Sequence, residues 1–292
     1  MIRYGPAGNS QSFHDLGYKG TKDLVPYCLR MGLTAFEYQC GRGVRIGEAA
    51  AAELGRQAAE ADIALSLHAP YYISLSGVDE EKRLGSLRYI LESARAVRWM
   101  GGRRIVIHAG SAGKIPREQA LALARDTMTR AIRMLDEEGL GEVILCPETM
   151  GKLGQLGNLE EVLALCKLDE RMIPCIDFGH LNARSYGGIR TRADYAAILD
   201  AIENALGYER LCHLHVHFSK IQYTIPGGEK THLTFEDTEY GPEFPPLAAE
   251  IVRRKLEPVL ICESDGTQAE DAGRMKATIE TIEREESQHG ES

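Results

Sequence analysis

The chain has 292 residues, of which 43% are hydrophobic and 26% charged, and its formal net charge at pH 7 is −9. This composition is typical of a soluble globular protein with a large core, and it excludes a chain that is disordered throughout, collagen-like or a coiled coil. The negative charge argues against a generally basic nucleic-acid coat, but a local positive groove or bound cations would still allow contact with DNA.

Short apolar or β-branched runs alternate with long amphipathic stretches from end to end. The runs predict strands at residues 2–5, 34–38, 64–68, 104–108, 143–147, 174–177, 212–217 and 259–263. The stretches between them predict helices, for example at 81–100, 117–138, 193–206 and 267–285. In the second of these, apolar residues recur every three or four positions, which is the spacing of a helix with one buried face.

Strands separated by helix-length segments indicate right-handed βαβ units and a parallel sheet. Eight such units without a Pro/Gly/Ser-rich linker predict a single (β/α)8 TIM barrel over residues 1–285, followed by a polar tail at 286–292. A doubly wound open sheet is the main alternative. It would normally carry a glycine-rich phosphate turn after an early strand, and the sequence has none.

Seven scattered cysteines, none in a CxxC pair, indicate reduced thiols and not a disulfide framework or a zinc ribbon. No apolar run approaches the ~20 residues needed to cross a bilayer, and the first ten residues lack the apolar stretch of a secretory signal. We therefore expect a cytoplasmic protein with no membrane association, acting as a monomer.

Histidines and acidic residues gather where the predicted strands end. They are His68, His108, Glu148, Asp177, His180, His215, His217, His232 and Glu263. In a barrel these ends converge on one face. Carboxylates crowded there would repel one another and histidines would be costly to bury, whereas zinc binds both neutral His and ionised Asp or Glu. Two or three metal ions are needed to use all of them.

Taken singly, these residues also have structural explanations. His68 fits a core histidine, Glu148 a solvent-facing charge, and Asp177 the N-cap of the next helix. His213, His215 and His217 alternate, so they share one face of their strand. We expect His213 to lie deepest and to be structural. The coincidence of such residues across seven strands is what favours a metal site.

Two segments resemble those of a known family. His68-Ala69-Pro70-Tyr71 is similar to the HAPY segment of the endonuclease IV family of apurinic/apyrimidinic endonucleases, and residues 175–180 resemble its CxDxxH signature. Further matches are His108-Ala109-Gly110-Ser111, the Gly-rich loop after Glu148, His215 and Lys220 around the seventh strand, His232, and Glu263. The resemblance spans residues 1 to about 270, so it covers nearly the whole chain.

The resemblance implies a trinuclear zinc phosphodiesterase that cleaves DNA on the 5′ side of an abasic site, as in base-excision repair. It implies that His68, His108 and Glu148 hold one zinc ion, that Glu148, Asp177, His215 and Glu263 hold a second with Glu148 shared, and that His180 and His232 hold a third. Zinc ions would neutralise the phosphodiester and activate a water. The catalytic residues would be Glu148 and Tyr71, with Tyr71 positioning the phosphate or sugar. Arg42 and Lys220 are the expected DNA contacts.

The sequence departs from the family pattern around the third metal. His217-Phe218 stands where the family has Asn-Asp, and Lys230 stands where it has an aspartate, with Glu229 one residue before. We expect His217 to replace that aspartate as a ligand of the third metal, because it lies one step nearer the rim than His215. Glu229 is the competing ligand.

A sugar isomerase or epimerase of the xylose-isomerase-like barrels is the alternative function. Glu148, Asp177, His215 and Glu263 also match the four ligands with which those enzymes bind one divalent ion, where Mn or Mg would replace zinc, and two glutamates would shuttle a proton. The histidines at 68, 108 and 232 favour the nuclease, since a one-metal site does not need them. A non-catalytic metal- or ligand-binding barrel is a third hypothesis, but it predicts missing ligands.

Overall fold

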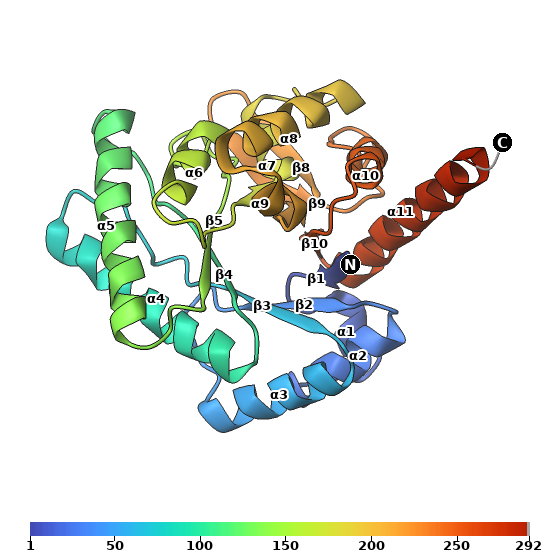
Figure 1. Cartoon of the computed structure of the whole chain (residues 1–292), viewed down its shortest axis with the longest axis horizontal. Helices are drawn as coiled ribbons and strands as arrows, with labels where there is room; N and C mark the ends of the chain where they lie inside the picture. Colours follow the sequence, from blue (N-terminus) through green and yellow to red (C-terminus); the bar gives the residue numbers. More distant parts are fainter. Residues whose placement is uncertain (291–292) are drawn as a thin grey trace.

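The structure is a computed structural model that describes residues 1–290, with side chains described for residues 1–288. Within these residues, eight parallel strands form a barrel enclosed by helices (Figure 1). The strands are β1 (Arg3–Pro6), β2 (Ala35–Gln39), β3 (Ala64–His68), β4 (Arg104–Ile107), β5 (Ile144–Pro147), β6 (Cys175–Asp177), β7 (His215–Phe218) and β10 (Val259–Cys262). The predicted (β/α)8 architecture is confirmed.

Two four-stranded sheets, ordered β1-β10-β7-β6 and β2-β3-β4-β5, make up the wall. The bridges Ala7↔Glu37 and Glu148↔Cys175 join them and close the barrel. Gly5 is required where β1 approaches β2, because a Cβ there would lie 2.1 Å from the carbonyl oxygen of Ala35. Closure brings the carboxyl ends of all these strands to one rim.

Helices cover the outside of the barrel. They are α1 (Gln11–Asp15), α2 (Leu24–Arg30), α3 (Glu48–Glu60), α4 (Glu80–Trp99), α5 (Arg117–Glu137), α6 (Leu159–Cys166), α7 (Phe178–Arg184), α8 (Arg192–Leu206), α9 (Tyr208–Cys212), α10 (Phe244–Arg253) and α11 (Gln268–Gly290), with a 3-10 turn at Thr21–Asp23. The four helices predicted from periodicity agree with α4, α5, α8 and α11. The tail predicted at 286–292 continues α11 as far as Gly290, and residues 291–292 lie outside the described residues. Figure 1 shows the C-terminal end of α11 projecting beyond the barrel.

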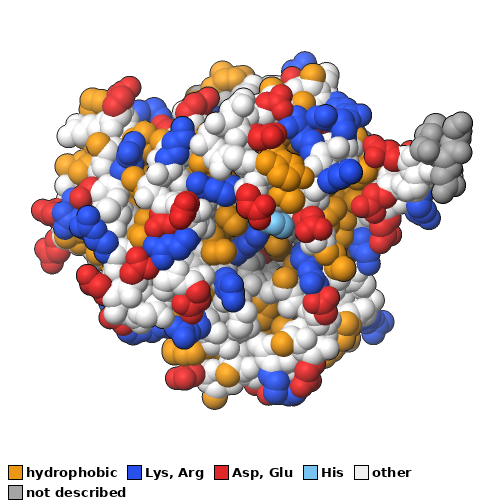
Figure 2. Space-filling view, viewed as in Figure 1, with side chains coloured by type: hydrophobic (Ala, Val, Ile, Leu, Met, Phe, Trp, Pro, Cys, Tyr) orange, Lys and Arg blue, Asp and Glu red, His pale blue; other side chains and the backbone are white. Residues whose placement is uncertain are grey.

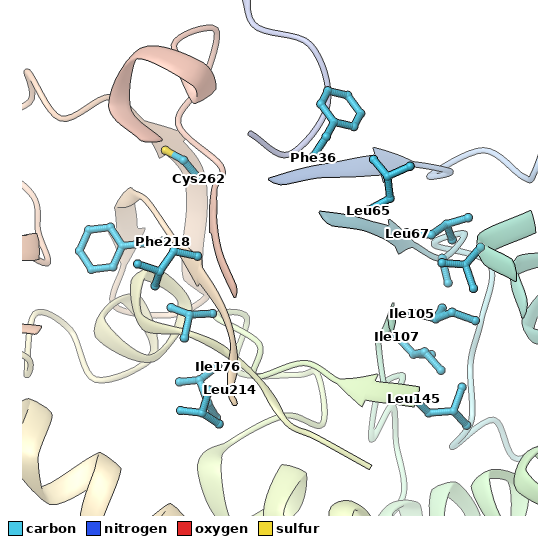
Figure 3. Packing of buried hydrophobic residues seen from close by; sticks show 14 of the residues in the cluster. Phe36, Leu65, Leu67, Ile105, Ile107, Leu145, Ile176, Leu214, Phe218 and Cys262 are labelled. Carbon is cyan, nitrogen blue, oxygen red and sulfur yellow. The ribbon is translucent and has the colours of Figure 1, made fainter. Parts of the chain in front are cut away.

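Alternation along the strands directs successive side chains outward to the helices and inward to the barrel interior. Leu65 and Leu67 of β3 belong to the hydrophobic core that packs the strands against the helices (Figure 3). The intervening Ser66 carries a hydroxyl that donates to the buried Glu37. Ala35 and Ile261 pack together in a separate small cluster. These two residues share the inward side of their strands with Glu37 and with the partners of His217, so the deep interior is apolar and the polar side chains lie above it, toward the rim.

An antiparallel hairpin, β8 (Lys220–Thr224) and β9 (Gly228–Leu233), lies between β7 and α10. No strands are predicted for this segment from the sequence. The hairpin is bonded to the loop after β5, since Leu153 N–H donates to Gly227 O and Glu229 N–H donates to Gly151 O, each at 3.2 Å. These bonds fix β9 beside the rim. In residues 1–290 no helix is long and apolar enough to cross a membrane.

Candidate active site

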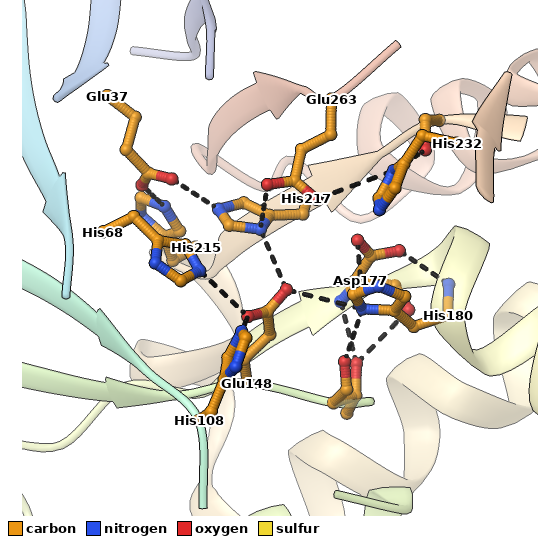
Figure 4. A network of polar contacts seen from close by, with 12 residues as sticks. Glu37, His68, His108, Glu148, Asp177, His180, His215, His217, His232 and Glu263 are labelled. Carbon is orange, nitrogen blue, oxygen red and sulfur yellow. Dashed lines mark hydrogen bonds and ion pairs between the residues drawn. The ribbon is translucent and has the colours of Figure 1, made fainter. Parts of the chain in front are cut away.

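The rim at the carboxyl ends of the strands holds a network of histidines and carboxylates centred on Glu148 (Figure 4). Four groups among the described residues offer ligand atoms that lie within 4.8 Å of one another. One of them, Cys175 with His215 and His217, is fully buried below the rim, and the other three lie at the rim. These three are His68 with His108 and Glu148; Glu148 with Asp177, His217 and Glu263; and His180 with His232 and Glu263. Each is contributed by several strands, so only the closed barrel assembles them.

Glu148 directs its two carboxylate oxygens to different sides of the network. Its Oε2 lies 3.0 Å from His108 Nε2 and 3.4 Å from His68 Nε2. Its Oε1 lies 3.1 Å from His217 Nδ1 and 3.4 Å from His180 Nδ1. Glu148 is 1% exposed. A carboxylate in this position can bind two cations at once.

Asp177 both caps a helix and faces the network. Its Oδ1 accepts the backbone N–H of His180 at 2.7 Å, which makes Asp177 the N-cap of α7. Its Oδ2 is buried and makes no hydrogen bond among the described residues. On the other side of the site, Glu263 Oε1 lies 3.4 Å from His217 Nδ1. The N-cap explanation of Asp177 and a ligand role are thus compatible, because each uses a different oxygen.

A β-bulge in β9 places Glu229 next to His180 and His232. Thr231 pairs with Gln222 and Glu229 with Tyr223, so Lys230 is the extra residue on β9. The bulge brings side chains three residues apart to one side of the strand. Glu229 Oε2 consequently lies 3.3 Å from His180 Nε2, and the His180 and His232 rings are 5.4 Å apart. Glu229 Oε2 is buried and makes no hydrogen bond within the described chain.

Backbone carbonyls set the tautomers of two histidines. His68 Nδ1 lies 2.9 Å from Ala69 O, and His180 Nδ1 lies 2.9 Å from Thr149 O. A carbonyl oxygen can only accept, so each Nδ1 carries the proton. The Nε2 of each ring faces a carboxylate, that of Glu148 for His68 and that of Glu229 for His180, and it is the nitrogen that would bind a cation. This arrangement is typical of metal-binding histidines.

Burial and neighbouring charges move the pKa values of the network in opposite directions. Burial alone would raise the pKa of Glu148, but hydrogen bonds from its four histidine neighbours hold that pKa well below its usual range. Burial raises the pKa of Glu263, and the charges of Glu148 and Asp177 add to the rise against the opposing effect of nearby histidines. Burial also lowers the pKa of His108. For His68 and His180, burial alone would lower the pKa of the imidazole, but the neighbouring carboxylates outweigh it and raise that pKa. A divalent cation would take the place of the protons that these histidines otherwise hold against the carboxylates.

The structure places His213, His215 and His217 differently from the sequence-based prediction. The group of Glu148, Asp177 and Glu263 contains His217, where His215 was predicted. His217 was itself predicted to belong with His180 and His232, and it lies outside that group. His215 lies one step deeper with its Nε2 donating to Glu37 at 2.8 Å, and burial lowers the pKa of His215 to about 4. His213, predicted to lie deepest, precedes the strand and its side chain is 41% exposed. The reason is that residues 208–212 form α9 and the strand begins only at His215.

A cavity of about 590 Å³ opens above the network, with Arg42, Tyr71, His232 and Glu263 among its lining residues. Tyr71 is 60% exposed and its ring stacks on His108 at 5.5 Å. Figure 2 shows a histidine in a hollow near the middle of this face, with acidic and basic side chains interspersed around it. Tyr71 and Arg42 are therefore placed to touch a ligand that enters from solvent.

Lys220 does not line this cavity, which corrects its predicted role as a DNA contact. Its side chain is 6% exposed, and Nζ donates to Asp237 O and to Glu243 Oε1, each at 2.6 Å. The ammonium group ties β8 to the segment before α10. Lys220 is a structural ion-pair partner.

Sequence reasoning missed Glu37, which is fully buried at the centre of β2. Burial alone would raise the pKa of Glu37, but His217 and His215 together hold it well below its usual range. A charged residue in the middle of an otherwise apolar predicted strand was the available signal, because such a charge needs a buried partner.

The chain is similar in sequence to a known family of proteins. Residues 25–285 match a family model described as Xylose isomerase-like TIM barrel. An uncharacterized protein of Methanocaldococcus jannaschii is 35% identical over 240 residues, covering 82% of this chain and 84% of that protein. Endonuclease 4 of Thermus thermophilus is 29% identical over 229 residues, covering 75% and 77%. The match to the probable endonuclease 4 of Mycoplasmoides gallisepticum, 28% identical, covers 53% of this chain and 50% of that protein.

Solved structures share the barrel. The crystal structure of endonuclease IV from Thermus thermophilus superposes with a TM-score of 0.68 at 19% identity, covering 96% of this chain and 99% of that one. A D-tagatose 3-epimerase-like protein superposes with a TM-score of 0.74 at 15% identity, covering 97% and 99%. At such low identity these superpositions establish the fold alone.

Proposed function

Because the chain belongs to the xylose isomerase-like TIM barrel family and is a divergent relative of endonuclease 4, we propose that it is a zinc-dependent phosphodiesterase that cleaves DNA on the 5′ side of abasic sites. The observation that carries this proposal is the number of ligand groups around Glu148. A barrel that binds one divalent ion needs four ligands, whereas this rim offers three groups, two of which share Glu148.

Three sets of residues would hold the metal ions. The first is His68, His108 and Glu148; the second is Glu148, Asp177, His217 and Glu263; the third is His180, His232 and Glu229, with Glu263 nearby. The residues fit cations because Asp177 Oδ2 and Glu229 Oε2 are buried oxygens without a hydrogen bond among the described residues. Each lies 3.3 Å from a ring nitrogen of His180, but a buried carboxylate oxygen without a hydrogen bond is costly, and a cation removes that cost.

When bound, zinc ions neutralise the charge of a phosphodiester and activate a water for attack. The protein's own residues orient the substrate. Tyr71, stacked on His108 at the mouth, positions the sugar or phosphate, and the positive charge of Arg42 faces flanking phosphates. Lys230 lines the same cavity and adds a second positive charge. Because the net charge of the protein is −9, DNA would be attracted by these few positive side chains and not by the protein surface as a whole.

A sugar epimerase is the second candidate. Glu148, Asp177, His217 and Glu263 form by themselves the four-ligand set of a one-metal barrel, and Glu148 and Glu263 could then exchange a proton with a carbon next to a carbonyl. On this alternative His68, His108 and His232 would have no role as ligands, which is why we favour the phosphodiesterase.

The first test combines metal counting with two assays. Purified protein loaded with zinc is analysed for metal per chain, then incubated with a duplex carrying one tetrahydrofuran abasic analogue, and separately with ketohexoses. We expect close to three zinc ions, a nick 5′ to the analogue that leaves a 3′-hydroxyl, and no epimerisation. One metal per chain together with epimerisation and no nicking would establish the alternative.

The Glu148→Gln variant tests the shared carboxylate. An amide cannot carry the charge that two cations require, so we expect nicking to fall to the background rate with the fold intact by circular dichroism. Glu250→Gln, on the outer helix α10, is the matched control and should nick normally at pH 7. Nicking by Glu148→Gln at close to the wild-type rate would contradict the dinuclear assignment.

A further inference from the structure

A buried carboxylate lies directly beneath the proposed metal ligands. Glu37 is fully buried, and its Oε2 accepts a hydrogen bond from His215 Nε2 at 2.8 Å. Its Oε1 lies 3.0 Å from His217 Nε2, within ion-pair distance, and this nitrogen makes no hydrogen bond to any described residue (Figure 4). Glu37 and His215 are 178 residues apart in the sequence, and none of the three proposed ligand sets uses Glu37.

Neighbouring donors hold Glu37 in one position. Ser66 Oγ donates to Oε2 at 2.9 Å, and Gln39 Nε2 donates to Oε1 at 3.3 Å. Together with His215, these groups give both oxygens a donor, and an ionised carboxylate is the side chain that only accepts. The position of Glu37 is therefore fixed independently of its contact with His217.

The two nitrogens of His217 face different surroundings. Nε2 faces Glu37, whereas Nδ1 lies 3.1 Å from Glu148 Oε1 and 3.4 Å from Glu263 Oε1. The buried thiol of Cys175 also lies close to the ring. The His217 ring is also stacked on His68, with 6.1 Å between centroids. A neutral imidazole carries its proton on one nitrogen, and the other nitrogen can bind a metal. A proton on Nδ1 would prevent this nitrogen from binding a cation that Glu148 would also hold.

We propose that Glu37 is a positioning residue for the metal centre, because it holds the Nε2 proton of His217 and so fixes the tautomer in which Nδ1 binds the cation. The inference rests on the proposed metal-dependent function and adds to it a buried residue that touches neither metal nor substrate. A carboxylate behind the imidazole also makes the ring a stronger electron donor to the metal. His215, Ser66 and Gln39 act only by anchoring Glu37.

Glu37→Gln is the direct test. Glutamine replaces one acceptor oxygen by an NH₂ donor, so it cannot accept from every group that Glu37 accepts from. We expect affinity for zinc at the site of His217 to fall about 10- to 100-fold, measured by competition with a chelator. In the zinc-loaded wild type, long-range ¹H–¹⁵N spectra should show the His217 proton on Nε2. In the variant that signal should be lost or split between tautomers.

Ser66→Ala is the matched control, since it removes one donor to Glu37 and leaves the contact with His217. Its zinc affinity should stay within about twofold of the wild type. This change is smaller than the 10- to 100-fold loss expected when the residue that hydrogen-bonds a metal-binding histidine is removed. If Glu37→Gln does not fold by circular dichroism, Glu37→Asp replaces it. That variant keeps the charge but is one methylene shorter, so it should weaken zinc binding by an intermediate factor.

The outcomes separate this inference from the proposed function. Unchanged zinc affinity in the folded Glu37 variant, with the His217 proton still on Nε2, would overturn the role of Glu37. A wild-type protein that binds zinc but does not nick abasic DNA contradicts only the proposed reaction. A wild-type protein that binds no zinc contradicts both proposals.

Discussion

Arg42 and Lys220 carry the same charge in opposite surroundings. Arg42 lines the cavity above the candidate site, whereas the Lys220 ammonium is buried between Asp237 and Glu243. An exposed cation near a phosphate contributes to binding, and a buried, paired cation contributes to stability.

We expect Arg42→Ala to weaken binding of an abasic duplex about 3- to 10-fold and to reduce the slope of log affinity against log salt by about one. Lys220→Ala should leave that slope unchanged and lower the free energy of unfolding by about 1–3 kcal/mol, since it leaves partners of a buried group unpaired. Fluorescence anisotropy over a salt series and urea unfolding measure the two effects. An unchanged affinity and slope for Arg42→Ala would place the DNA path elsewhere.

At the scale of single elements, the bulge in β9 decides which residues face His180. Lys230 is the extra residue, so Glu229 and His232 lie on one side although they are three positions apart. In a regular strand, residues two apart share a side. Deleting Lys230 should therefore remove the bulge without separating Glu229 from His232.

We expect the Lys230 deletion to keep three zinc ions per chain. Its affinity for the third ion should stay within about tenfold of the wild type, because tenfold is the smallest loss expected when a residue that supports a metal ligand is removed. Glu229→Ala should lose one zinc ion, because it removes a carboxylate ligand. Inductively coupled plasma mass spectrometry after dialysis counts the ions. If Glu229→Ala retains three, or the deletion retains two, the assignment of Glu229 is wrong.

Helices α8 and α10 are joined by a buried carboxylate. Glu250 of α10 is 2% exposed, and its oxygens accept hydrogen bonds from Arg192 at the start of α8 and from Arg253 and Arg254. Burial alone would raise the pKa of Glu250, but the three guanidinium groups outweigh it and lower that pKa to about 2. A folded-state pKa below the unfolded value means that this stabilisation is present above the unfolded pKa and is lost as the pH falls toward 2.

We expect Glu250→Gln to lower the free energy of unfolding by about 2 kcal/mol at pH 7. Because the variant does not titrate at this position, its difference from the wild type should shrink as the pH falls from about 5 to about 2. Urea unfolding at several pH values measures both free energies. A difference that stays constant over this range would show that Glu250 is not held in its charged form by the arginines.

At the scale of the whole molecule, the candidate site brings together carboxylates from β2, the loops after β5 and β10, the end of β6, and β9. Their mutual repulsion opposes closure of the barrel unless cations lie between them. Cations that bind the folded chain more tightly than the unfolded chain raise its stability.

We expect removal of metal with EDTA to lower the unfolding temperature by about 5 °C or more, and zinc to restore it, since an ion at a thousand times its dissociation constant adds about 4 kcal/mol. Differential scanning calorimetry measures the shift. Glu148→Gln should show a smaller shift than the wild type. An unfolding temperature that does not respond to zinc in the wild type would contradict a metal centre in this barrel.

The barrel and most of the residues at its rim were predictable from the sequence. The alternation of short apolar runs and amphipathic stretches predicted all eight barrel strands, because periodicity is a local property. It also predicted that His68, His108, Glu148, Asp177 and Glu263 would meet, because parallel strands present their carboxyl ends on one face. The residues in β9 were named without their strand, and the hairpin was missed because its pairing depends on the loop after β5.

Which histidine joins each ligand group, and which residue lies behind it, follow from the packing of the closed barrel. A helical turn, α9, occupies residues 208–212, so the strand starts later than its alternation predicts and His217 reaches the rim in place of His215. The bulge at Lys230 and the contact between Glu37 and His217 are likewise set by pairing between distant segments. Local periodicity specifies which face a side chain takes, but strand starts and cross-barrel contacts follow from packing of the closed barrel.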